Sequence, residues 1–215
     1  MVEAPLKIGV LAVQGDFAEH AAMLRRAAAD AHEEVTSEVV VREVRTPRDL
    51  ADLDGLIVPG GESTTIGKLL VAYGLEEPIR EAARAGLPVW GTCAGMILLA
   101  RDIVGGEPDG RIGLMDLKVQ RNAFGRQLDS FEVDLPFAGL DHPIHAVFIR
   151  APLVQRVGPE AEALATLPDG RVVAARQGNL LATAFHPELT PDTRLHGLFI
   201  RSCQQSARRG LHSAA

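Results

Sequence analysis

The feature that most constrains the fold is an alternation, over the first hundred residues, of short apolar runs with longer segments of helical character. The apolar runs are bounded by Gly and Pro and predict strands at 8–13, 39–44, 55–58 and 88–91. The segments between and after them predict helices at 17–30, 64–73, 76–85 and 94–101. Each crossover can return the chain to the same edge of a parallel sheet. We therefore expect an α/β fold of three layers, an open, mostly parallel sheet with helices on both faces.

The second half of the chain, past Gly105, is rich in predicted strands. Alternating or β-branched runs predict strands at 114–119, 130–133, 146–150, 171–177 and 180–185, which we expect to extend the sheet. An amphipathic helix follows at about 193–208, and residues 210–215 are expected to be a disordered tail. The length, and a sequence without repeats, favour a single domain over 1–215 with its core at about 7–209.

Composition and charge exclude two classes of function. A net charge of -6 with 4% aromatic residues provides neither a basic stripe nor stacking platforms for nucleic acid. The longest uncharged stretch, 87–100, has fourteen residues, too few to span a membrane. The first residues do not resemble an export signal. We therefore expect a small-molecule or protein partner.

The two cysteines bear on location and on metals. Cys93 and Cys203 are 110 positions apart and form no cluster with metal-ligand spacing. A single disulfide would be unusual in a reducing compartment, so we expect free thiols in the cytoplasm. We expect neither a metal nor a cofactor.

The segment Gly91-Thr92-Cys93-Ala94-Gly95 places a thiol between a buried strand and a helix. A nucleophile on such a sharp turn needs small neighbours, as in the Gly-x-Ser-x-Gly elbow of hydrolases. The first N–H groups of the helix favour the thiolate. A buried structural cysteine is the alternative, and Cys203, in the last helix, keeps that interpretation.

The segment Phe185-His186-Pro187-Glu188 supplies a candidate base and a carboxylate at the end of an apolar strand. Positions i and i+2 of an extended backbone face the same side, and Pro187 favours an extended His186. His186 can then move the thiol proton while Glu188 holds its tautomer. A loop or capping role is the alternative for this pair. For His20, His32, His142, His145, His196 and His212 we expect surface or packing roles.

A glycine-rich loop follows the strand at 55–58, with the sequence Pro59-Gly60-Gly61-Glu62-Ser63. The N–H of Gly61, with that of Ala94, is a candidate oxyanion hole. A tight turn with Ser63 as the helix N-cap is compatible with that role. Arg121 and Arg150 are fixed charges suited to a carboxylate, with surface ion pairs as the alternative.

These residues together resemble the class I glutamine amidotransferase family, which has a flavodoxin-like fold, and within it the glutaminase subunits of pyridoxal 5'-phosphate synthase. The resemblance runs from Ile8 to about His196. The triad of Cys93, His186 and Glu188 is typical only of the broad class I family. The subfamily is indicated by Gly-Glu-Ser-Thr-Thr at 61–65, Arg-Asn-Ala-Phe-Gly-Arg-Gln at 121–127 and Phe-Ile-Arg-Ala-Pro at 148–152. The segment 32–41 is longer and more acidic than expected of this family.

The resemblance implies a reaction and a partner. Glutamine and water would give glutamate and ammonia through a glutamyl thioester on Cys93. Contacts to glutamine would come from Gly61, Glu62, Ser63, Arg121, Ile149 and Arg150. The ammonia would pass to a synthase subunit, a (β/α) barrel that makes the vitamin B6 cofactor. Gln14, Gly15 and the Gly60-Gly61 loop would lie near the contact with that subunit.

Three other functions compete with this interpretation. A cysteine peptidase or deglycase of related fold usually has His directly after the nucleophile, where this chain has Ala94. A γ-glutamyl hydrolase would cleave γ-glutamyl peptides as readily as free glutamine. A non-catalytic subunit that supports a synthase has no need of an intact triad.

Overall fold

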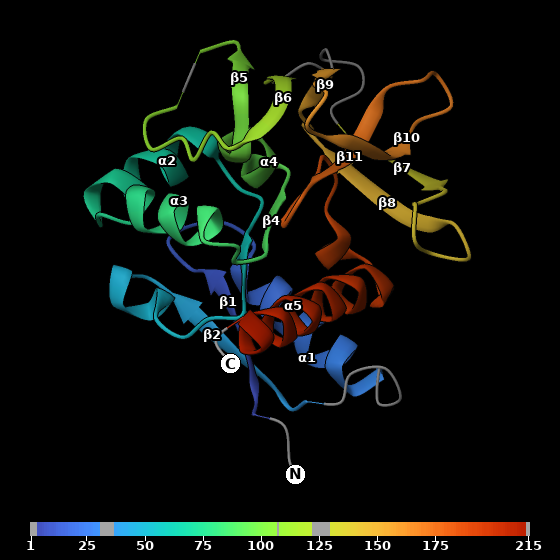
Figure 1. Cartoon of the computed structure of the whole chain (residues 1–215). Helices are drawn as coiled ribbons and strands as arrows, with labels where there is room; N and C mark the ends of the chain where they lie inside the picture. The colour runs from blue at the N-terminus through green and yellow to red at the C-terminus, as the bar shows by residue number, and fades with distance from the viewer. Residues whose placement is uncertain (1–3, 31–36, 107, 122–129, 214–215) are drawn as a thin grey trace.

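A seven-stranded sheet forms the middle layer of the molecule, in the order β10-β11-β12-β4-β3-β1-β2. The computed structural model describes residues 4–30, 37–106, 108–121 and 130–213 (Figure 1). Five neighbouring strands of the sheet, β12, β4, β3, β1 and β2, are parallel. β11 pairs with β12 in antiparallel orientation, and β10 pairs with β11 in the same way. The bounds of the sheet strands are β1 Leu6–Leu11, β2 Val39–Val44, β3 Gly55–Val58, β4 Val89–Thr92, β10 Glu162–Thr166, β11 Val172–Gln177 and β12 Leu180–Thr183.

Helices cover both faces of this sheet, so the expected three-layer α/β fold is confirmed. On one side α1 (Phe17–Asp30) packs against α5 (Arg194–Ser213). On the other side α2 (Ser63–Ala72) packs against α3 (Glu76–Arg84) and α4 (Ala94–Leu99), as Figure 1 shows. Every residue of β3, β4 and β12 is buried, because helices cover these central strands on both sides.

The remaining strands do not extend the central sheet, and that part of our prediction is wrong. β5 (Ala100–Val104), β6 (Met115–Gln120) and β9 (Leu153–Val157) form a separate three-stranded sheet. β7 (Ser130–Leu135) and β8 (Ile144–Ile149) form a two-stranded one. Exposed and covered residues alternate along β7 and β8. Strands with one solvated face do not fit a middle layer that is covered on both sides.

Other element boundaries also differ from the prediction. The fourth helix ends at Leu99, and residues 100 and 101 begin β5. β9, β10 and two short 3-10 turns, η1 (Pro47–Leu50) and η2 (Pro187–Leu189), have no counterpart in it. The last helix runs to Ser213. The prediction of a disordered tail from residue 210 is therefore wrong for residues 210–213. Residues 31–36, within the unusual segment 32–41, lie outside the described residues.

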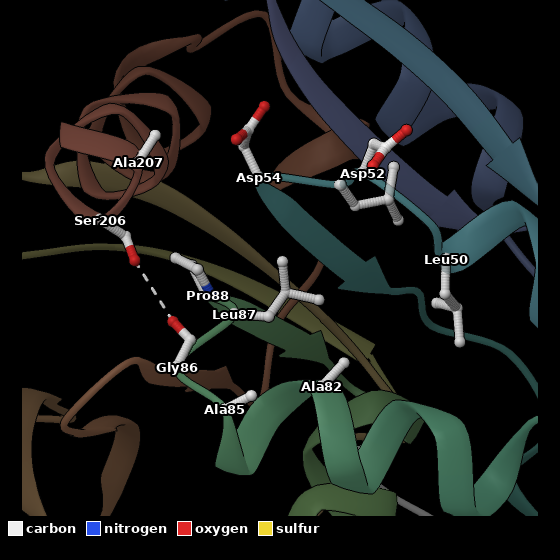
Figure 2. Close-up of a pocket in the computed structure, with 11 residues that line it drawn as sticks. Leu50, Asp52, Asp54, Ala82, Ala85, Gly86, Leu87, Pro88, Ser206 and Ala207 are labelled. Carbon is white, nitrogen blue, oxygen red and sulfur yellow. Dashed lines mark hydrogen bonds between the residues drawn. The ribbon is translucent and has the colours of Figure 1, made fainter. Parts of the chain in front are cut away.

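A hollow of about 310 Å³ opens at the amino ends of β3 and β4, shown in Figure 2. Asp54 and Pro88, which directly precede the two strands, line it, and Ser206 of α5 donates a hydrogen bond to Gly86 O at its edge (3.3 Å). The carboxyl ends of the same strands, where a ligand crevice is expected in such a sheet, lie at the opposite edge. Among the described helices, none has both the length and the apolar character needed to cross a bilayer.

Candidate active site

Cys93 occupies a strained turn between β4 and α4. Its backbone angles are φ 47° and ψ −100°, a region that residues with a side chain rarely adopt. Its N–H donates to Thr183 O of the adjacent strand β12 at 2.8 Å. The thiol is buried, with 6% of the residue exposed. Strain held at one buried thiol is typical of a functional position.

The glycines on either side of Cys93 are required by close approach of the backbone. A Cβ on Gly95 would lie 2.1 Å from Val58 O, and one on Gly91 would lie 2.5 Å from Gly95 O. The start of α4 therefore contacts the end of β3 directly. This is the crowding that the elbow interpretation predicts at these two positions.

His186 lies at the same edge of the sheet as Cys93. Thr183 of β12 pairs with Thr92 of β4 in parallel register, so both chains leave the sheet side by side. The backbone N–H of His186 donates to Val147 O of β8 at 2.8 Å. Burial lowers the pKa of His186, but hydrogen bonds with Asp16, Cys93 and Glu188 outweigh it and raise that pKa well above 6.5. The sulfur and the imidazole, 93 positions apart in sequence, therefore lie at the same edge of the sheet, and Cys93 is one of the groups that raise the pKa of His186.

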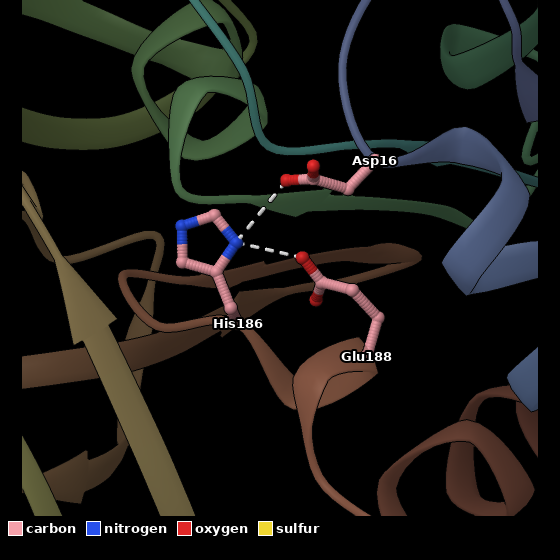
Figure 3. Close-up of side chains that lie close together, drawn as sticks. All are labelled: Asp16, His186 and Glu188. Carbon is pink, nitrogen blue, oxygen red and sulfur yellow. Dashed lines mark hydrogen bonds and ion pairs between the residues drawn. The ribbon is translucent and has the colours of Figure 1, made fainter.

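Two carboxylates face the same nitrogen of His186, as Figure 3 shows. Nδ1 lies 2.6 Å from Glu188 Oε1 and 3.4 Å from Asp16 Oδ2. The Glu188 side chain is fully buried, whereas that of Asp16 is 37% exposed. Because the carboxylates hold Nδ1–H, Nε2 is the nitrogen available to the sulfur. An imidazole with its proton on Nδ1 is the tautomer that a general base requires.

The geometry that brings Glu188 to His186 differs from the predicted one. β12 ends at Thr183, and Pro187 opens the 3-10 turn η2 with His186 as its N-cap. A proline has no N–H and a fixed φ, so it suits the first position of a helical turn. The turn, rather than an extended strand, folds the carboxylate back onto the imidazole.

Asp16, His186 and Glu188 also have the composition of a metal-binding group, since one ligand atom from each lies within 4.8 Å of the others. The Nδ1 atom of this group is engaged by Glu188 at hydrogen-bond distance. We therefore interpret the group as a hydrogen-bonded cluster that orients the imidazole.

The glycine-rich loop connects to the cluster through its backbone. Asp16 N–H donates to Gly60 O at 3.2 Å, and Glu62 N–H donates to the side-chain oxygen of Gln14 at 3.0 Å. Gly61 between them has φ 148°, where other residues are strained. Next to Cys93, Ala94 is the first residue of α4, so its N–H has no carbonyl within the helix to bond.

Glu62, and not Ser63, caps α2. Its carboxylate accepts from Thr64 N at 3.0 Å and from Thr65 N at 2.6 Å, while Ser63 is the first helical residue and is buried. Burial raises the pKa of Glu62, but hydrogen bonds from Thr65 and Thr64 outweigh it and lower that pKa to about 2. The N-cap expected at Ser63 is therefore wrong by one position, because the longer Glu side chain reaches the same N–H groups.

The other predicted substrate residues divide between two places. Arg121 donates to Thr64 Oγ1 at 2.8 Å and lies 3.6 Å from Glu62 Oε1, which ties it to the start of α2. The carbonyl of Ile149 lies 3.9 Å from the sulfur of Cys93. Arg150 follows with a positive φ of 45° and is exposed. Residues 122–129, the rest of the Arg121 motif, lie outside the described residues.

Three residues that lie at the site are not among the predicted site residues. Asp16 contacts His186, as described above. His20 and His196, for which we expected surface or packing roles, are fully buried and bonded to each other behind Glu188. Asp16 directly follows the Gln14-Gly15 motif, and that position is the one signal in the sequence that points to it.

Comparison with known proteins identifies relatives over nearly the whole chain. Residues 10–205 match the model described as "SNO glutamine amidotransferase family". The "Pyridoxal 5'-phosphate synthase subunit PdxT" of Herpetosiphon aurantiacus is 55% identical over 199 residues, covering 91% of this chain and 99% of the relative. The protein of that name from Moorella thermoacetica is 56% identical over 197 residues, covering 91% and 98%. A solved structure described as "Crystal structure of glutamine amidotransferase" has 48% identity and a TM-score of 0.81, covering 92% of this chain and 98% of the other.

Proposed function

This chain belongs to the SNO glutamine amidotransferase family, and on that premise we propose that it is the glutaminase subunit of a pyridoxal 5'-phosphate synthase. It hydrolyses glutamine to glutamate and ammonia. The observation that carries the chemistry is that Cys93 and His186 leave the same edge of the sheet from two adjacent parallel strands, with Cys93 among the groups that raise the pKa of His186.

Cys93 is the nucleophile of the proposed reaction. His186 takes the thiol proton, and the sulfur attacks the side-chain carbonyl of glutamine. His186 then gives the proton to the departing nitrogen, which leaves as ammonia, and a glutamyl thioester remains on Cys93. Water, deprotonated by His186, attacks the thioester, and glutamate and the thiol are released. Glu188 keeps the imidazole oriented and stabilises its charged form.

The negative oxygen of each tetrahedral intermediate needs donors, and we assign the N–H groups of Gly61 and Ala94 to it. Ala94 supports this role because the first N–H of a helix lacks an internal partner. The substrate contacts in this proposal are Gly61, Glu62, Ser63, Arg121, Ile149 and Arg150. Ile149 has the most direct support, because its carbonyl approaches the sulfur.

The partner in the proposal is a synthase subunit with a (β/α) barrel, which takes up the ammonia. Gln14, Gly15 and the Gly60-Gly61 loop would lie near that contact, and the bond between Gln14 and Glu62 couples the segments. We assign the chain to the cytoplasm, where its two free cysteines would stay reduced. We also propose that residues 1–215 act as one glutaminase domain.

The test is ammonia release from glutamine by the purified chain, alone and with the barrel subunit. We expect slow release that the barrel subunit accelerates, and a covalent glutamyl adduct on Cys93 detectable by mass spectrometry after acid quenching. Cys93→Ala removes activity and adduct, and Cys203→Ala, at the other free cysteine, retains both. Undiminished turnover of Cys93→Ala would refute the assigned nucleophile. Equal cleavage of a γ-glutamyl peptide would instead favour a γ-glutamyl hydrolase.

A further inference from the structure

We propose that His20 is a positioning residue that donates its Nε2–H to the far oxygen of Glu188, and that His196 fixes the tautomer in which it can do so. This inference rests on the proposed role of Glu188 as the carboxylate of the triad. It adds a second layer of two histidines behind that triad, built from α1 and α5.

The contacts run in one line away from the crevice. Glu188 holds His186 with Oε1 and turns Oε2 toward α1, where His20 Nε2 lies 3.3 Å away. The same nitrogen of His20 lies 3.0 Å from Thr92 Oγ1, next to the nucleophile in sequence. On its other side, His20 Nδ1 lies 3.0 Å from His196 Nε2. His20 therefore contacts both the strand end that carries Cys93 and the turn that carries Glu188.

The surroundings leave Glu188 Oε2 few donors. It is one of two buried side-chain atoms, among the described residues, without a hydrogen bond of standard geometry; the other is His196 Nδ1. A buried carboxylate oxygen without a donor is costly, and His20 Nε2 is within reach of it. Trp90 packs edge-on against both histidine rings, with centroids at 5.8 Å and 4.9 Å, and holds them in place.

Only one assignment of protons suits this line of atoms. If His196 donates Nε2–H to His20 Nδ1, then His20 Nε2 carries a proton that faces Glu188 and Thr92. The one unpaired atom left is His196 Nδ1, a neutral acceptor. In the reverse assignment Thr92 Oγ1–H can donate to His20 Nε2, but Glu188 Oε2 is left without a donor and His196 Nδ1 becomes a buried N–H without an acceptor. A buried unpaired donor together with a buried carboxylate oxygen that lacks a donor is the costlier arrangement.

Both histidines are neutral at physiological pH. Burial lowers the pKa of His20 well below 6.5, and the nearby His196 and His186 lower it further. Burial lowers the pKa of His196 to about 3, with Asp192 opposing. The titratable groups that face the pair are thus Glu188 and His186 on one side and Asp192, two residues before α5, on the other.

The contribution of His20 follows from the state of Glu188. Burial raises the pKa of Glu188, and the hydrogen bond with His186 opposes this. A donor on Oε2 favours the ionised carboxylate. Without it, Glu188 takes up a proton at higher pH and ceases to hold His186 Nδ1–H as an anion. The acid limb of the kcat profile should then move to higher pH.

The tautomers can be read directly from the unmodified protein. In 15N-labelled protein, long-range 1H–15N spectra distinguish Nε2–H from Nδ1–H histidines. We expect His20 and His196 to be neutral Nε2–H tautomers with slowly exchanging protons. An Nδ1–H tautomer at His20 would overturn the inference. This measurement does not depend on glutamine hydrolysis, so it separates failure of the inference from failure of the proposed function.

Kinetics of paired variants test the positioning role. His20→Leu keeps the volume and removes the donor, and we expect kcat to fall about 10- to 100-fold, the range for residues that orient a catalytic ligand, with a smaller change in KM. His20→Gln, whose amide can place an N–H near the Nε2 position, should recover most of the loss. A folded His20→Leu variant with wild-type kcat and an unmoved acid limb would overturn the proposal. If His20→Leu does not fold, His196→Leu gives the same readout, because it frees His20 to adopt the wrong tautomer.

Discussion

At the scale of the residue, the strained backbone of Cys93 lowers the folding stability at the position where the proposed reaction needs a thiol. Its φ and ψ belong to a region that only glycine adopts without strain, and such a residue costs about 1–3 kcal/mol. We expect Cys93→Gly to unfold at a higher midpoint than Cys93→Ala. Cys203 in α5 gives the opposite order, because glycine is about 1 kcal/mol worse than alanine inside a helix. Thermal denaturation of the four variants checks this. A higher unfolding midpoint for the alanine variant than for the glycine variant at both positions would contradict it.

Asp16 supports the charged form of the His186 imidazole. Its carboxylate is 3.4 Å from Nδ1, and its hydrogen bond is the largest of the contributions that raise the pKa of His186. Asp16→Asn should therefore let the imidazolium lose its proton at lower pH, moving the alkaline limb of kcat/KM for glutamine hydrolysis downward. Asp52→Asn, an exposed position at the far edge of the sheet, should leave the limb in place. An alkaline limb that stays in place in Asp16→Asn would show that Glu188 and Cys93 set the titration of His186 without Asp16.

The residues of the site were predictable from sequence to different degrees. Cys93, His186 and Glu188 stand in local patterns, a glycine-flanked elbow and a strand that ends in polar side chains. The contacts of Asp16 and His20 join the first twenty residues to a turn some 170 positions later. No local spacing encodes such a contact. The spacing of His186 and Glu188 predicts their pairing on an extended strand, whereas a 3-10 turn produces it.

At the scale of the element, the packing of α4 on β3 depends on the missing side chain of Gly95. Gly95→Ala would place a Cβ 2.1 Å from Val58 O, which forces the short helix away from the strand and displaces Cys93. We expect a loss of about 1–3 kcal/mol of unfolding free energy, typical of overpacking, together with loss of glutaminase activity.

Gly197 in α5 is the matched control for this substitution. Its added Cβ would meet only the end of the Arg201 side chain at 3.6 Å, so Gly197→Ala should be neutral or stabilise by up to about 1 kcal/mol. Urea denaturation of both variants measures the difference. Equal stability of the two proteins would show that α4 can shift without cost.

The bounds of an element were best predicted where its local sequence pattern is strong. β2, β3 and α1 have the predicted bounds, because continuous apolar runs and helical periodicity are strong signals. β9 and β10 went unseen, since short strands with mixed polar residues, such as Glu162–Thr166, look like loops. The separate small sheets were missed because an alternating pattern identifies a half-solvated strand and not the sheet to which it pairs.

At the scale of the whole molecule, the buried histidine pair makes folding stability depend on pH. The folded pKa values of His20 and His196 lie below the unfolded value of 6.5, so their contribution is present above pH 6.5 and is lost as pH falls below it. Each histidine should add a slope of about 1.4 kcal/mol per pH unit in that range. The double variant His20→Leu, His196→Leu should therefore show a flatter acid limb in unfolding free energy.

His145 makes folding stability depend on pH in the opposite direction to His20 and His196. Its pKa is raised by hydrogen bonds to Asp134 and Glu132, so its contribution is present below pH 6.5 and is lost as pH rises through the higher folded value. His145→Gln should not flatten the acid limb. A limb of unchanged slope in the double variant would mean that other groups carry the acid sensitivity.

The parallel pairing of β4 with β12 also has a consequence for synthesis of the protein. The ribosome delivers Cys93, the proposed nucleophile, first and His186, the proposed base, only 93 residues later, after the strands of both small sheets have been synthesised. A growing chain thus exposes a thiol without its proton acceptor and has no hydrolytic power of its own. If the proposed roles hold, translation must pass Glu188 before ammonia can be produced, so a product truncated before that residue would be catalytically silent.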